Sequence, residues 1–312
     1  MSDLKSQLVK DSSSGWWKVC TGTPLEQAVV SFIHKSWGSS SYFPGPQPIS
    51  IERKHFPILK KNEYVVCEKS DGIRHVLVSF MFGDKKMCVL VNRAFAIFIV
   101  SINLPKTAYQ GSILDGELVD KNFLVYDAVI ISGTDVKGCN LFERLHGAET
   151  IINGILRMKT DPITLKIKTF YNLKDFKKFQ SEYLPTIEYQ TDGLIFTPVK
   201  DPIRIGTHET MFKWKPRDSN TIDFQAKKWG NTKWGLYVQE KGHFIFESEL
   251  SFDKTPDWIT EDCIVECQYM CDEEPRWWKP VGLRTDKKHP NNRNTFYKTI
   301  TNIRENIKMS EF

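Results

Sequence analysis

Apolar residues recur with two different periods along the chain, and each period predicts one kind of secondary structure. Stretches in which apolar residues stand three or four positions apart predict amphipathic helices that bury one face. Four stretches of this kind are present, at residues 24–36, 141–155, 173–183 and 296–307. The long intervals between them lack this spacing, so the helices are expected to flank a structure of another kind.

Those intervals show the alternation of apolar and polar residues that is typical of β-strands. Strands are predicted from residue 64 to residue 130 and again after Pro185. Beyond residue 220, short strands with predicted glycine turns at Gly230, Gly235 and Gly242 favour a small β-barrel. Residues 1–22 are polar and rich in serine, and we expect them to form a loose arm.

The order of these elements predicts an α+β fold in two domains, which suits a length of 312 residues. We expect a first domain of antiparallel sheets with flanking helices over residues 1–219, with a hinge at residues 216–220. The β-barrel is expected over 220–290, and a C-terminal helix over 291–312 is expected to pack back on the first domain. The proline-rich segment 43–48 fits either a rigid loop or the wall of a cleft.

Composition narrows the class of protein only moderately. Hydrophobic residues make up 40%, charged residues 26%, and the net charge is +5. This charge permits an anionic ligand but does not indicate a long nucleic-acid footprint. No apolar run approaches the ~20 residues of a membrane helix, and we expect neither a secretory signal nor membrane attachment.

The cysteines indicate a reducing compartment. There are seven of them, an odd number, and none forms a C-x-x-C pair. Cys263, Cys267 and Cys271 are spaced by four, but they fall on a predicted strand without a nearby histidine. We therefore expect buried thiols there and no zinc site.

The segment Glu68-Lys-Ser-Asp-Gly-Ile-Arg74 carries the strongest candidate chemistry. It places Lys69 beside a predicted strand-to-strand turn, where a lysine can project into a cleft and attack a phosphate. A lysine with its usual pKa of about 10.4 is protonated at neutral pH, and burial or neighbouring cations favour the neutral amine. Lys213 and Lys215 share one face of a predicted strand and can grip a phosphate, although they also fit solvated charges.

Other candidates complete a nucleotide site built from side chains. Neither a phosphate-binding P-loop nor a Gly-x-Gly-x-x-Gly fingerprint is present, so side chains must hold any nucleotide. Glu117 and Asp192 supply the hard oxygen ligands that Mg²⁺ prefers. Tyr126 fits either a surface for stacking a base or an ordinary core residue.

Six motifs follow one another in the order that characterises a known superfamily. They are Lys69-Ser-Asp-Gly-Ile-Arg74, Leu114-Asp-Gly-Glu117, Phe123-Leu-Val-Tyr-Asp127, Thr191-Asp-Gly-Leu-Ile-Phe196, Met211-Phe-Lys-Trp-Lys215 and Arg284-Thr-Asp-Lys287. Together they resemble the collinear motifs of the covalent nucleotidyltransferases, which include mRNA capping guanylyltransferases and ATP-dependent DNA and RNA ligases. The sequences around residues 43–50, 213–224 and 284–291 resemble capping enzymes more than ligases.

This resemblance implies a fold and an activity. The fold is a nucleotidyltransferase domain of the ATP-grasp-like, DNA-ligase type, followed by an OB-fold barrel. The activity is mRNA capping: Lys69 attacks the α-phosphorus of GTP, releases pyrophosphate and passes GMP to a 5′-diphosphate RNA end. The alternatives are an ATP-dependent polynucleotide ligase and an inactive scaffold that binds RNA 5′ ends or polymerase tails.

The resemblance also implies roles for individual residues. The catalytic residues are Lys69 as nucleophile, with Arg284, Asp286 and Lys287. Among the GTP-binding residues, Arg74 and Glu117 are expected at the ribose and Tyr126 at the base. Arg93, Lys213 and Lys215 are expected at phosphates, and Asp192 near the metal. Asp223, with Arg284 and Lys287, is expected at the β- and γ-phosphates. Asp192 and Glu117 are the expected ligands of Mg²⁺ or Mn²⁺.

The same resemblance implies partners and a location. RNA 5′-triphosphatase and cap methyltransferase activities are expected on other chains, and the phosphorylated tail of RNA polymerase II is an expected partner. The expected location is the nucleus, or the cytoplasm for a viral protein.

Overall fold

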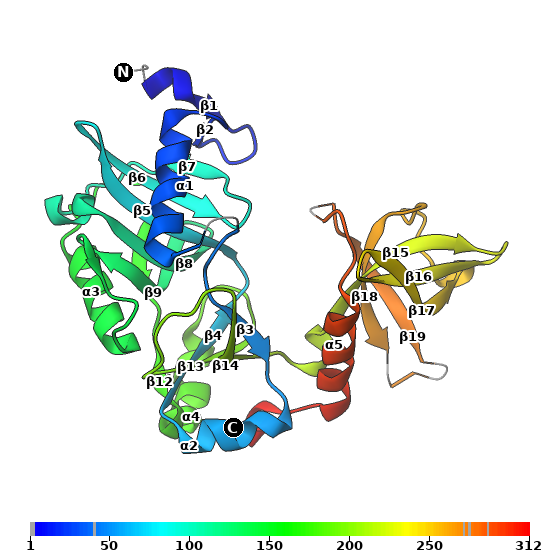
Figure 1. Ribbon diagram of the computed structural model, residues 1–312. Helices are drawn as coiled ribbons and strands as arrows, with labels where there is room; N and C mark the ends of the chain where they lie inside the picture. Colours follow the sequence, from blue (N-terminus) through cyan, green and yellow to red (C-terminus); the bar gives the residue numbers. More distant parts are fainter. Residues whose placement is uncertain (1–3, 40–41, 271, 274–275, 286) are drawn as a thin grey trace. The chain divides into compact units, whose positions relative to one another are not determined.

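The computed structural model describes residues 4–39, 42–270, 272–273, 276–285 and 287–312, and shows two compact units. The first unit comprises Met1–Ile49 and Leu59–Phe212, and the second comprises Ser50–Ile58 and Lys213–Phe312 (Figure 1). Segment 50–58 is therefore grouped with the C-terminal part of the chain. Cys271 and Asp286, both considered above, lie outside the described residues.

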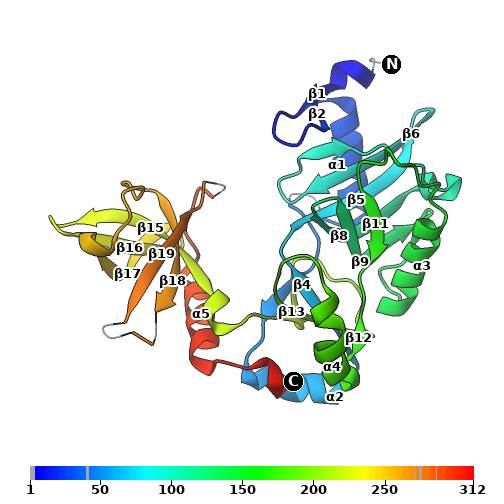
Figure 2. The ribbon, with the colours of Figure 1, turned by 180° about the vertical axis from the view of Figure 1, so that it is seen from behind.

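A large, mainly antiparallel sheet forms most of the first unit. Its strands run in the order β1-β2-β7-β6-β5-β8-β9-β10, and β11 pairs with β9 in parallel. Strands β1, β5, β6, β8, β9 and β11 are labelled in Figure 2. The strands are β1 (Leu8–Lys10), β2 (Trp17–Val19), β5 (Ile73–Phe82), β6 (Lys85–Asn92), β7 (Ile97–Ile99), β8 (Ser112–Val119), β9 (Asn122–Ile131), β10 (Thr134–Asp135) and β11 (Thr164–Ile167).

The prediction of a loose N-terminal arm was wrong. After a 3₁₀ turn, η1 (Leu4–Gln7), strands β1 and β2 pair with each other, and β2 extends the large sheet. Val19 is 4% exposed, and the side chain of Gln7 accepts a hydrogen bond from the Leu25 amide at 2.9 Å. A few buried contacts therefore anchor a segment that is otherwise polar.

Alternation along β5 sends its side chains into two cores, one on each face of the sheet. Val76 and Val78 pack with α1 (Pro24–Trp37), whereas Leu77 packs with α3 (Leu141–Asn153). Both helices begin where the sequence predicts. Thr23 caps the first amide groups of α1, and Asn140 forms a capping box with Glu143 at α3.

A smaller sheet completes the first unit and carries the lysine motif. Its strands are β12 (Tyr171–Asn172), β4 (Tyr64–Ser70), β13 (Thr191–Pro198), β14 (Thr207–Trp214) and β3 (Gln47–Ser50), in that order. The last residues of β14 and β3 belong to the second unit. A 3₁₀ turn, η3 (Lys106–Gln110), precedes β8.

The helix predicted over 173–183 is broken into short turns. They are η4 (Leu173–Asp175), α4 (Phe176–Lys178), η5 (Phe179–Tyr183) and η6 (Leu184–Thr186). The rings of Tyr171, Phe176 and Tyr183 all lie within 6 Å of the Phe179 ring. Packing of these aromatic rings takes precedence over a regular helical path, and Pro185 cannot donate the next backbone hydrogen bond.

The second unit contains an antiparallel sheet of five strands in the order β17-β16-β15-β18-β19. They are β15 (Thr221–Trp229), β16 (Lys233–Glu240), β17 (His243–Ser251), β18 (Ile264–Met270) and β19 (Trp277–Leu283). In chain order this is 3-2-1-4-5, and the edge strands β17 and β19 also contact each other, so the sheet curls as in an OB-fold. The predicted α+β fold with a C-terminal OB-fold is confirmed.

The glycine turns of this sheet are only partly as predicted. Gly230 and Gly242 lie in turns with φ of 66° and 84°. Gly235 instead lies inside β16, where a Cβ atom would come within 2.7 Å of the Tyr237 ring. A packing requirement, not a turn, accounts for this glycine.

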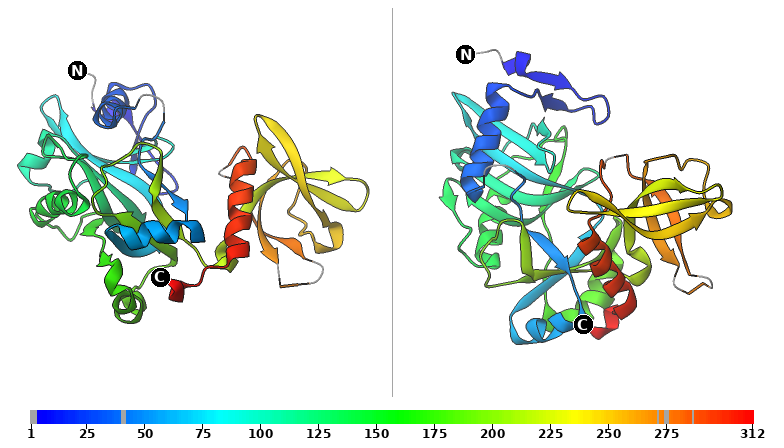
Figure 3. Two further views of the ribbon diagram at one scale, coloured as in Figure 1. Left: turned by 60° about the horizontal axis from the view of Figure 1, so that its bottom comes forward. Right: turned by 45° about the vertical axis from the view of Figure 1, so that its right-hand side comes forward.

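Helix α5 (Arg293–Glu305) packs on β15 and β16 of the second unit (Figure 3). It ends one residue before Asn306, which has φ of 43°, so Ile307 of the predicted stripe lies beyond the helix. The unit also holds η2 (Arg53–His55), η7 (Arg217–Ser219), η8 (Phe252–Lys254) and η9 (Met309–Glu311), while α2 (Phe56–Lys61) leads back to the first unit. No described helix is long and apolar enough to cross a membrane.

Candidate active site

Strands β4 and β5 position the two ends of the lysine motif. They are joined by a tight turn at Asp71-Gly72, where a Cβ on Gly72 would approach the Leu118 carbonyl oxygen to 2.6 Å. Lys69 stands near the end of β4, opposite Gly193 of β13. Its Nζ lies 2.7 Å from Asp192 Oδ1, and the two side chains are 24% and 23% exposed. The pairing of β4 with β13 therefore brings two motifs, 123 residues apart, into contact.

A cavity of about 160 Å³ opens in the first unit beside this ion pair. Many of the residues predicted for nucleotide binding line it. The lining includes Lys69, Arg74, Arg93, Glu117 and Tyr126, together with Pro46, Pro48, Cys67, Asp127, Lys168, Phe170, Ile195, Thr197 and Met211. Pro46 and Pro48 place the proline-rich segment on its wall. Burial raises the pKa of the Cys67 thiol to about 12, so this thiol stays protonated at neutral pH.

Arg74 is held by an acceptor that the sequence did not single out. Its Nε donates to Asp115 at 3.0 Å, its Nη2 donates to the same carboxylate, and its Nη1 donates to the Pro46 carbonyl at 2.6 Å. Burial lowers the pKa of Arg74, but the charge of Asp115 outweighs it and the net shift is upward. Gly45 is required beside this guanidinium, because a Cβ there would lie 2.3 Å from Nη2.

Tyr126 joins the same cluster from β9. Its hydroxyl donates to Asp115 Oδ1 at 2.9 Å, and the Arg74 guanidinium lies 5.7 Å from its ring centroid. Burial raises the pKa of this hydroxyl well above its ordinary value, so the ring stays neutral. Tyr126 lines the cavity, and its hydroxyl is bound to another residue of the same cluster.

A chain of polar side chains runs from Glu117 into the protein interior. Ser70 Oγ donates to Glu117 and accepts from Lys168 Nζ at 2.9 Å. Lys168 also pairs with Glu68 at 3.3 Å, and the Tyr189 hydroxyl donates to Glu68 at 2.6 Å. Sequence reasoning missed Lys168. The only signal was a lysine at an inward position of an alternating segment, and its partners lie about a hundred residues away in the chain.

Arg93 reaches the cavity from the loop after β6. Burial, and then the positive charge of Arg74, lower its pKa. Two cations thus share one wall, and an anionic ligand would relieve their repulsion.

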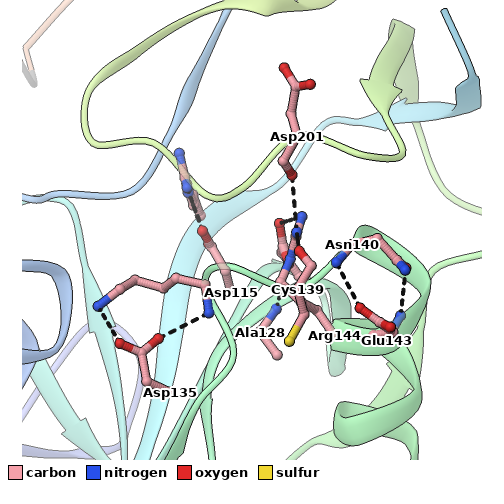
Figure 4. Close-up of polar contacts among 11 residues, drawn as sticks. Asp115, Ala128, Asp135, Cys139, Asn140, Glu143, Arg144 and Asp201 are labelled. Carbon is pink, nitrogen blue, oxygen red and sulfur yellow. Dashed lines mark hydrogen bonds and ion pairs between the residues drawn. The ribbon is translucent and has the colours of Figure 1, made fainter.

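Asp127, at the end of the tyrosine motif, has a structural partner. Arg144 donates from Nε to Asp127 Oδ1 at 2.6 Å and from Nη2 to Oδ2 at 3.0 Å. Its Nη1 reaches the carbonyls of Cys139 and Asp201 at 2.6 and 3.2 Å (Figure 4). Arg144 is 2% exposed, so this pair fixes α3 and a neighbouring loop behind the cavity.

The second unit assembles its own predicted cluster. Asp223 on β15 accepts from Arg284 Nη1 at 3.0 and 3.1 Å and from Lys287 Nζ. Asn291 holds Asp223 from the other side, since its side chain accepts from the Asp223 amide at 2.9 Å. Lys213 on β14 and Lys215, just beyond the strand, line a small cavity of this unit with Arg217 and Asn302.

Two models of known families match the chain. The mRNA capping enzyme catalytic domain matches residues 19–217, and the mRNA capping enzyme C-terminal domain matches residues 219–312. The chain belongs to the mRNA capping enzyme family. This confirms the resemblance found in the ordered motifs.

Curated relatives of this capping-enzyme chain come from fungi and animals. It is 28% identical over 325 residues to the mRNA-capping enzyme subunit alpha of Schizosaccharomyces pombe, covering 88% of this chain and 80% of that protein. It is 27% identical over 285 residues to the mRNA-capping enzyme of Danio rerio, covering 82% of this chain and 46% of that protein. The chain thus spans less than half of the fish protein.

Among solved structures, a mycobacterial DNA ligase D complexed with ATP and MES is similar at 13% identity and a TM-score of 0.43. The match covers 78% of this chain and 96% of that one.

Proposed function

We propose that this chain is an mRNA guanylyltransferase that works through a covalent lysyl–GMP intermediate. The observation that carries the proposal is the amine of Lys69 at the rim of a cavity lined by Arg74, Arg93 and Glu117, inside a chain of the capping enzyme family. In the first step, Nζ of Lys69 attacks the α-phosphorus of GTP, an N–P bond forms, and the bond to pyrophosphate breaks. In the second, a β-phosphate oxygen of 5′-diphosphate RNA attacks the same phosphorus, and the lysine is released.

The cavity residues would bind GTP in distinct ways. The ring of Tyr126 offers a flat apolar surface to the guanine. Glu117 would accept from ribose hydroxyls. Arg74 uses three N–H groups on Asp115 and Pro46, and its remaining N–H groups would reach the ribose. Arg93 would contact the phosphates.

The residues present fit a divalent cation, Mg²⁺ or Mn²⁺. Among the described residues no group of three or more His, Cys, Asp or Glu side chains converges on one point. Mg²⁺ commonly binds through one or two carboxylates together with substrate phosphates and water, and Asp192 and Glu117 would supply those carboxylates. When bound, the ion neutralises phosphate charge during the transfer.

The second unit would contribute phosphate contacts. Lys213 and Lys215 would grip the α-phosphate. Asp223 orients Arg284 and Lys287, which would bind the β- and γ-phosphates. Asp286 would support them.

The partners follow from the reaction. The RNA substrate carries a 5′-diphosphate, so an RNA 5′-triphosphatase would act before the transfer of GMP, and a cap methyltransferase would act on the product. The phosphorylated tail of RNA polymerase II is the proposed recruiting surface, and the nucleus is the proposed location.

One labelling experiment tests the proposal. The protein is incubated with Mg²⁺ and α-³²P-labelled GTP or ATP, and denatured protein is examined for covalent label. Label from GTP alone supports capping, label from ATP alone supports a ligase, and no label supports an inactive scaffold. Lys69→Arg should abolish the label, while the matched control Lys85→Arg, at an exposed position of the same unit, should keep it.

A further inference from the structure

Four aromatic residues gather on the outer surface of the second unit's sheet. They are Trp229 on β15, Tyr237 on β16, and Phe244 and Phe246 on β17, and we call this set the aromatic face. Trp229 is 46% exposed, and Phe244 and Phe246 are each 40% exposed. A contiguous patch of exposed apolar side chains often marks an interaction site.

Strand register explains why these rings share one side. Tyr237 pairs with Phe246, and the next pair, Val238 with Ile245, points the other way into the core. The rings contact one another: Trp229 and Phe246 have centroids 4.3 Å apart, and Tyr237 and Phe246 are 5.7 Å apart, both edge-to-face. The aromatic face is therefore a continuous surface across three strands.

Gly235 keeps the middle of this surface open. It pairs with Lys227 on one side and Glu249 on the other, so it occupies an outward position between two longer side chains. A Cβ at this position would lie 2.7 Å from the Tyr237 ring. The absence of a side chain at Gly235 leaves room for the Tyr237 ring.

Lysines are interleaved with the rings. Lys227 Nζ lies 4.6 Å from the centroid of Phe244 and 3.4 Å from Asp262. Lys233 pairs with Glu249, whereas Lys241 stands exposed in the turn between β16 and β17. Cations beside exposed rings suit a ligand that is both anionic and flat.

The aromatic face continues toward the phosphate-binding cluster of the second unit. Alternation along β15 puts Asp223, Lys227 and Trp229 on one side of the strand, because Ile222, Phe224 and Ala226 all enter the core. Six residues of strand separate Asp223 from Trp229, or about 20 Å. The cluster of Asp223 with Arg284 and Lys287 and the aromatic face thus lie along the same strand.

We propose that the aromatic face binds the single-stranded segment of the RNA that follows its 5′ end, by stacking bases on Trp229, Tyr237 and Phe246. This inference rests on the proposed function, which requires an RNA substrate. OB-fold sheets bind single strands through aromatic rings beside cationic side chains, and stacking tolerates any base. Such tolerance is needed by an enzyme that modifies transcripts of different sequence.

The charges favour RNA that is held mainly by stacking. Two of these three lysines, Lys227 and Lys233, already have acidic partners, so only about one phosphate is neutralised on binding. For single strands, a plot of log affinity against log salt concentration should then have a slope of about −0.7. A surface that bound by charge alone would give a steeper slope.

The test measures RNA affinity on the full chain. The probe is a 12-nucleotide RNA with a 5′-diphosphate and a 3′ fluorophore, followed by anisotropy. We expect W229A/F246A to raise Kd by about tenfold or more, since each stacked base contributes a factor of this order. W229Y/F246Y, which keeps two rings, should restore most of the affinity. Trp258→Ala, at a 37% exposed tryptophan outside the three strands, is the matched control and should leave Kd within twofold of wild type.

Other outcomes overturn the proposal. If W229A/F246A leaves Kd unchanged, or if Trp258→Ala raises Kd by the same factor, the RNA does not bind at the aromatic face. If the wild type self-associates and W229A/F246A abolishes this association, the aromatic face binds a second copy of the chain. If the aromatic face binds a phosphorylated peptide in place of RNA, its ligand is a protein. Thermal unfolding of each variant identifies a loss of fold, in which case single W229A and F246A variants replace the pair. Label transfer from GTP needs no RNA, so its failure in the wild type rejects the proposed function independently of the RNA result.

Discussion

The amine of Lys69 and the carboxylate of Asp192 lie 2.7 Å apart, across the paired strands β4 and β13. The pair is partly exposed, so solvent weakens its contribution to stability, and it holds the amine beside the cavity. In the proposed reaction Asp192 also holds the divalent cation. In that reaction the Asp192 carboxylate would contact both the attacking amine of Lys69 and the cation that neutralises the phosphates.

Asp192→Asn should slow formation of the lysyl–GMP adduct by about 10²-fold or more, a loss typical of removing one electrostatic contact at a reaction centre. The amide keeps the size of the side chain but loses its charge. The measurement is single-turnover labelling with GTP, and Asp175→Asn, at an exposed position of the same unit, is the control. An adduct that forms at the wild-type rate would exclude this role for Asp192.

Tyr126 permits a separation of ring and hydroxyl. Tyr126→Phe removes the hydrogen bond to Asp115 but keeps the ring at the cavity wall. We expect a loss of about 1 kcal/mol in the free energy of unfolding, because Asp115 keeps its bonds to Arg74, with KM for GTP changed by less than about threefold. Tyr126→Ala should raise KM by more than about tenfold if the ring stacks on the base. Urea unfolding and steady-state kinetics provide the two readouts. Equal KM values for both variants would show that the ring does not bind GTP.

The elements that the sequence predicted well are those whose signal is local. Alternation around the lysine motif located β4 and β5, and the spacing of apolar residues located α1 and α3. The contact of Lys69 with Asp192 follows from two motifs that the resemblance had already connected. The N-terminal strands were missed because each is only three residues long, which is too short to establish an alternation, and of their residues only Val19 is buried.

The polar partners behind the cavity were missed for a different reason. Lys168 contacts Ser70 and Glu68 because the tertiary structure brings the segment that follows β11 next to β4. Asp115 was noted only as part of an Asp-Gly-Glu motif, and nothing local indicates that it accepts from both Arg74 and Tyr126. Contacts between distant segments depend on tertiary packing, which a single sequence does not display.

Removing one partner of the buried Arg144–Asp127 pair should destabilise the protein more than removing both partners. Burial raises the pKa of Asp127 even though the Arg144 charge opposes this shift. Arg144→Leu should lower the free energy of unfolding by about 3–5 kcal/mol, because it leaves the carboxylate buried without its partner. The double variant Arg144→Leu/Asp127→Leu should recover part of this loss in urea unfolding. A double variant less stable than Arg144→Leu would contradict the explanation.

In the second unit, the indole Nε1 of Trp214 donates to the Ile307 carbonyl at 2.8 Å, and its ring packs edge-on against Phe312. This bond anchors the residue between Lys213 and Lys215 to the C-terminal segment. Trp214→Phe should lower the free energy of unfolding by about 1–2 kcal/mol through the lost bond and reduced packing. Trp258→Phe, at a more exposed site, should cost less. Chemical denaturation measures the free energy of unfolding of both variants. Equal losses in the two variants would show that the Trp214 hydrogen bond is not a specific anchor.

Acid should destabilise the first unit through two buried histidines. His75 and His208 are 4% and 2% exposed, and burial lowers the pKa of both below the ordinary value of about 6.5. Below pH 6.5 the unfolded chain therefore binds more protons at these sites than the folded chain. Their contribution to stability is complete above that pH and is lost as the pH falls toward the folded-state pKa, by at most about 1.4 kcal/mol per pH unit for each histidine. Urea unfolding between pH 7.5 and pH 5 should show this loss, and His75→Gln should reduce the slope, whereas the exposed control His146→Gln should not. A slope that is the same in His75→Gln and wild type would show that this histidine does not carry the effect.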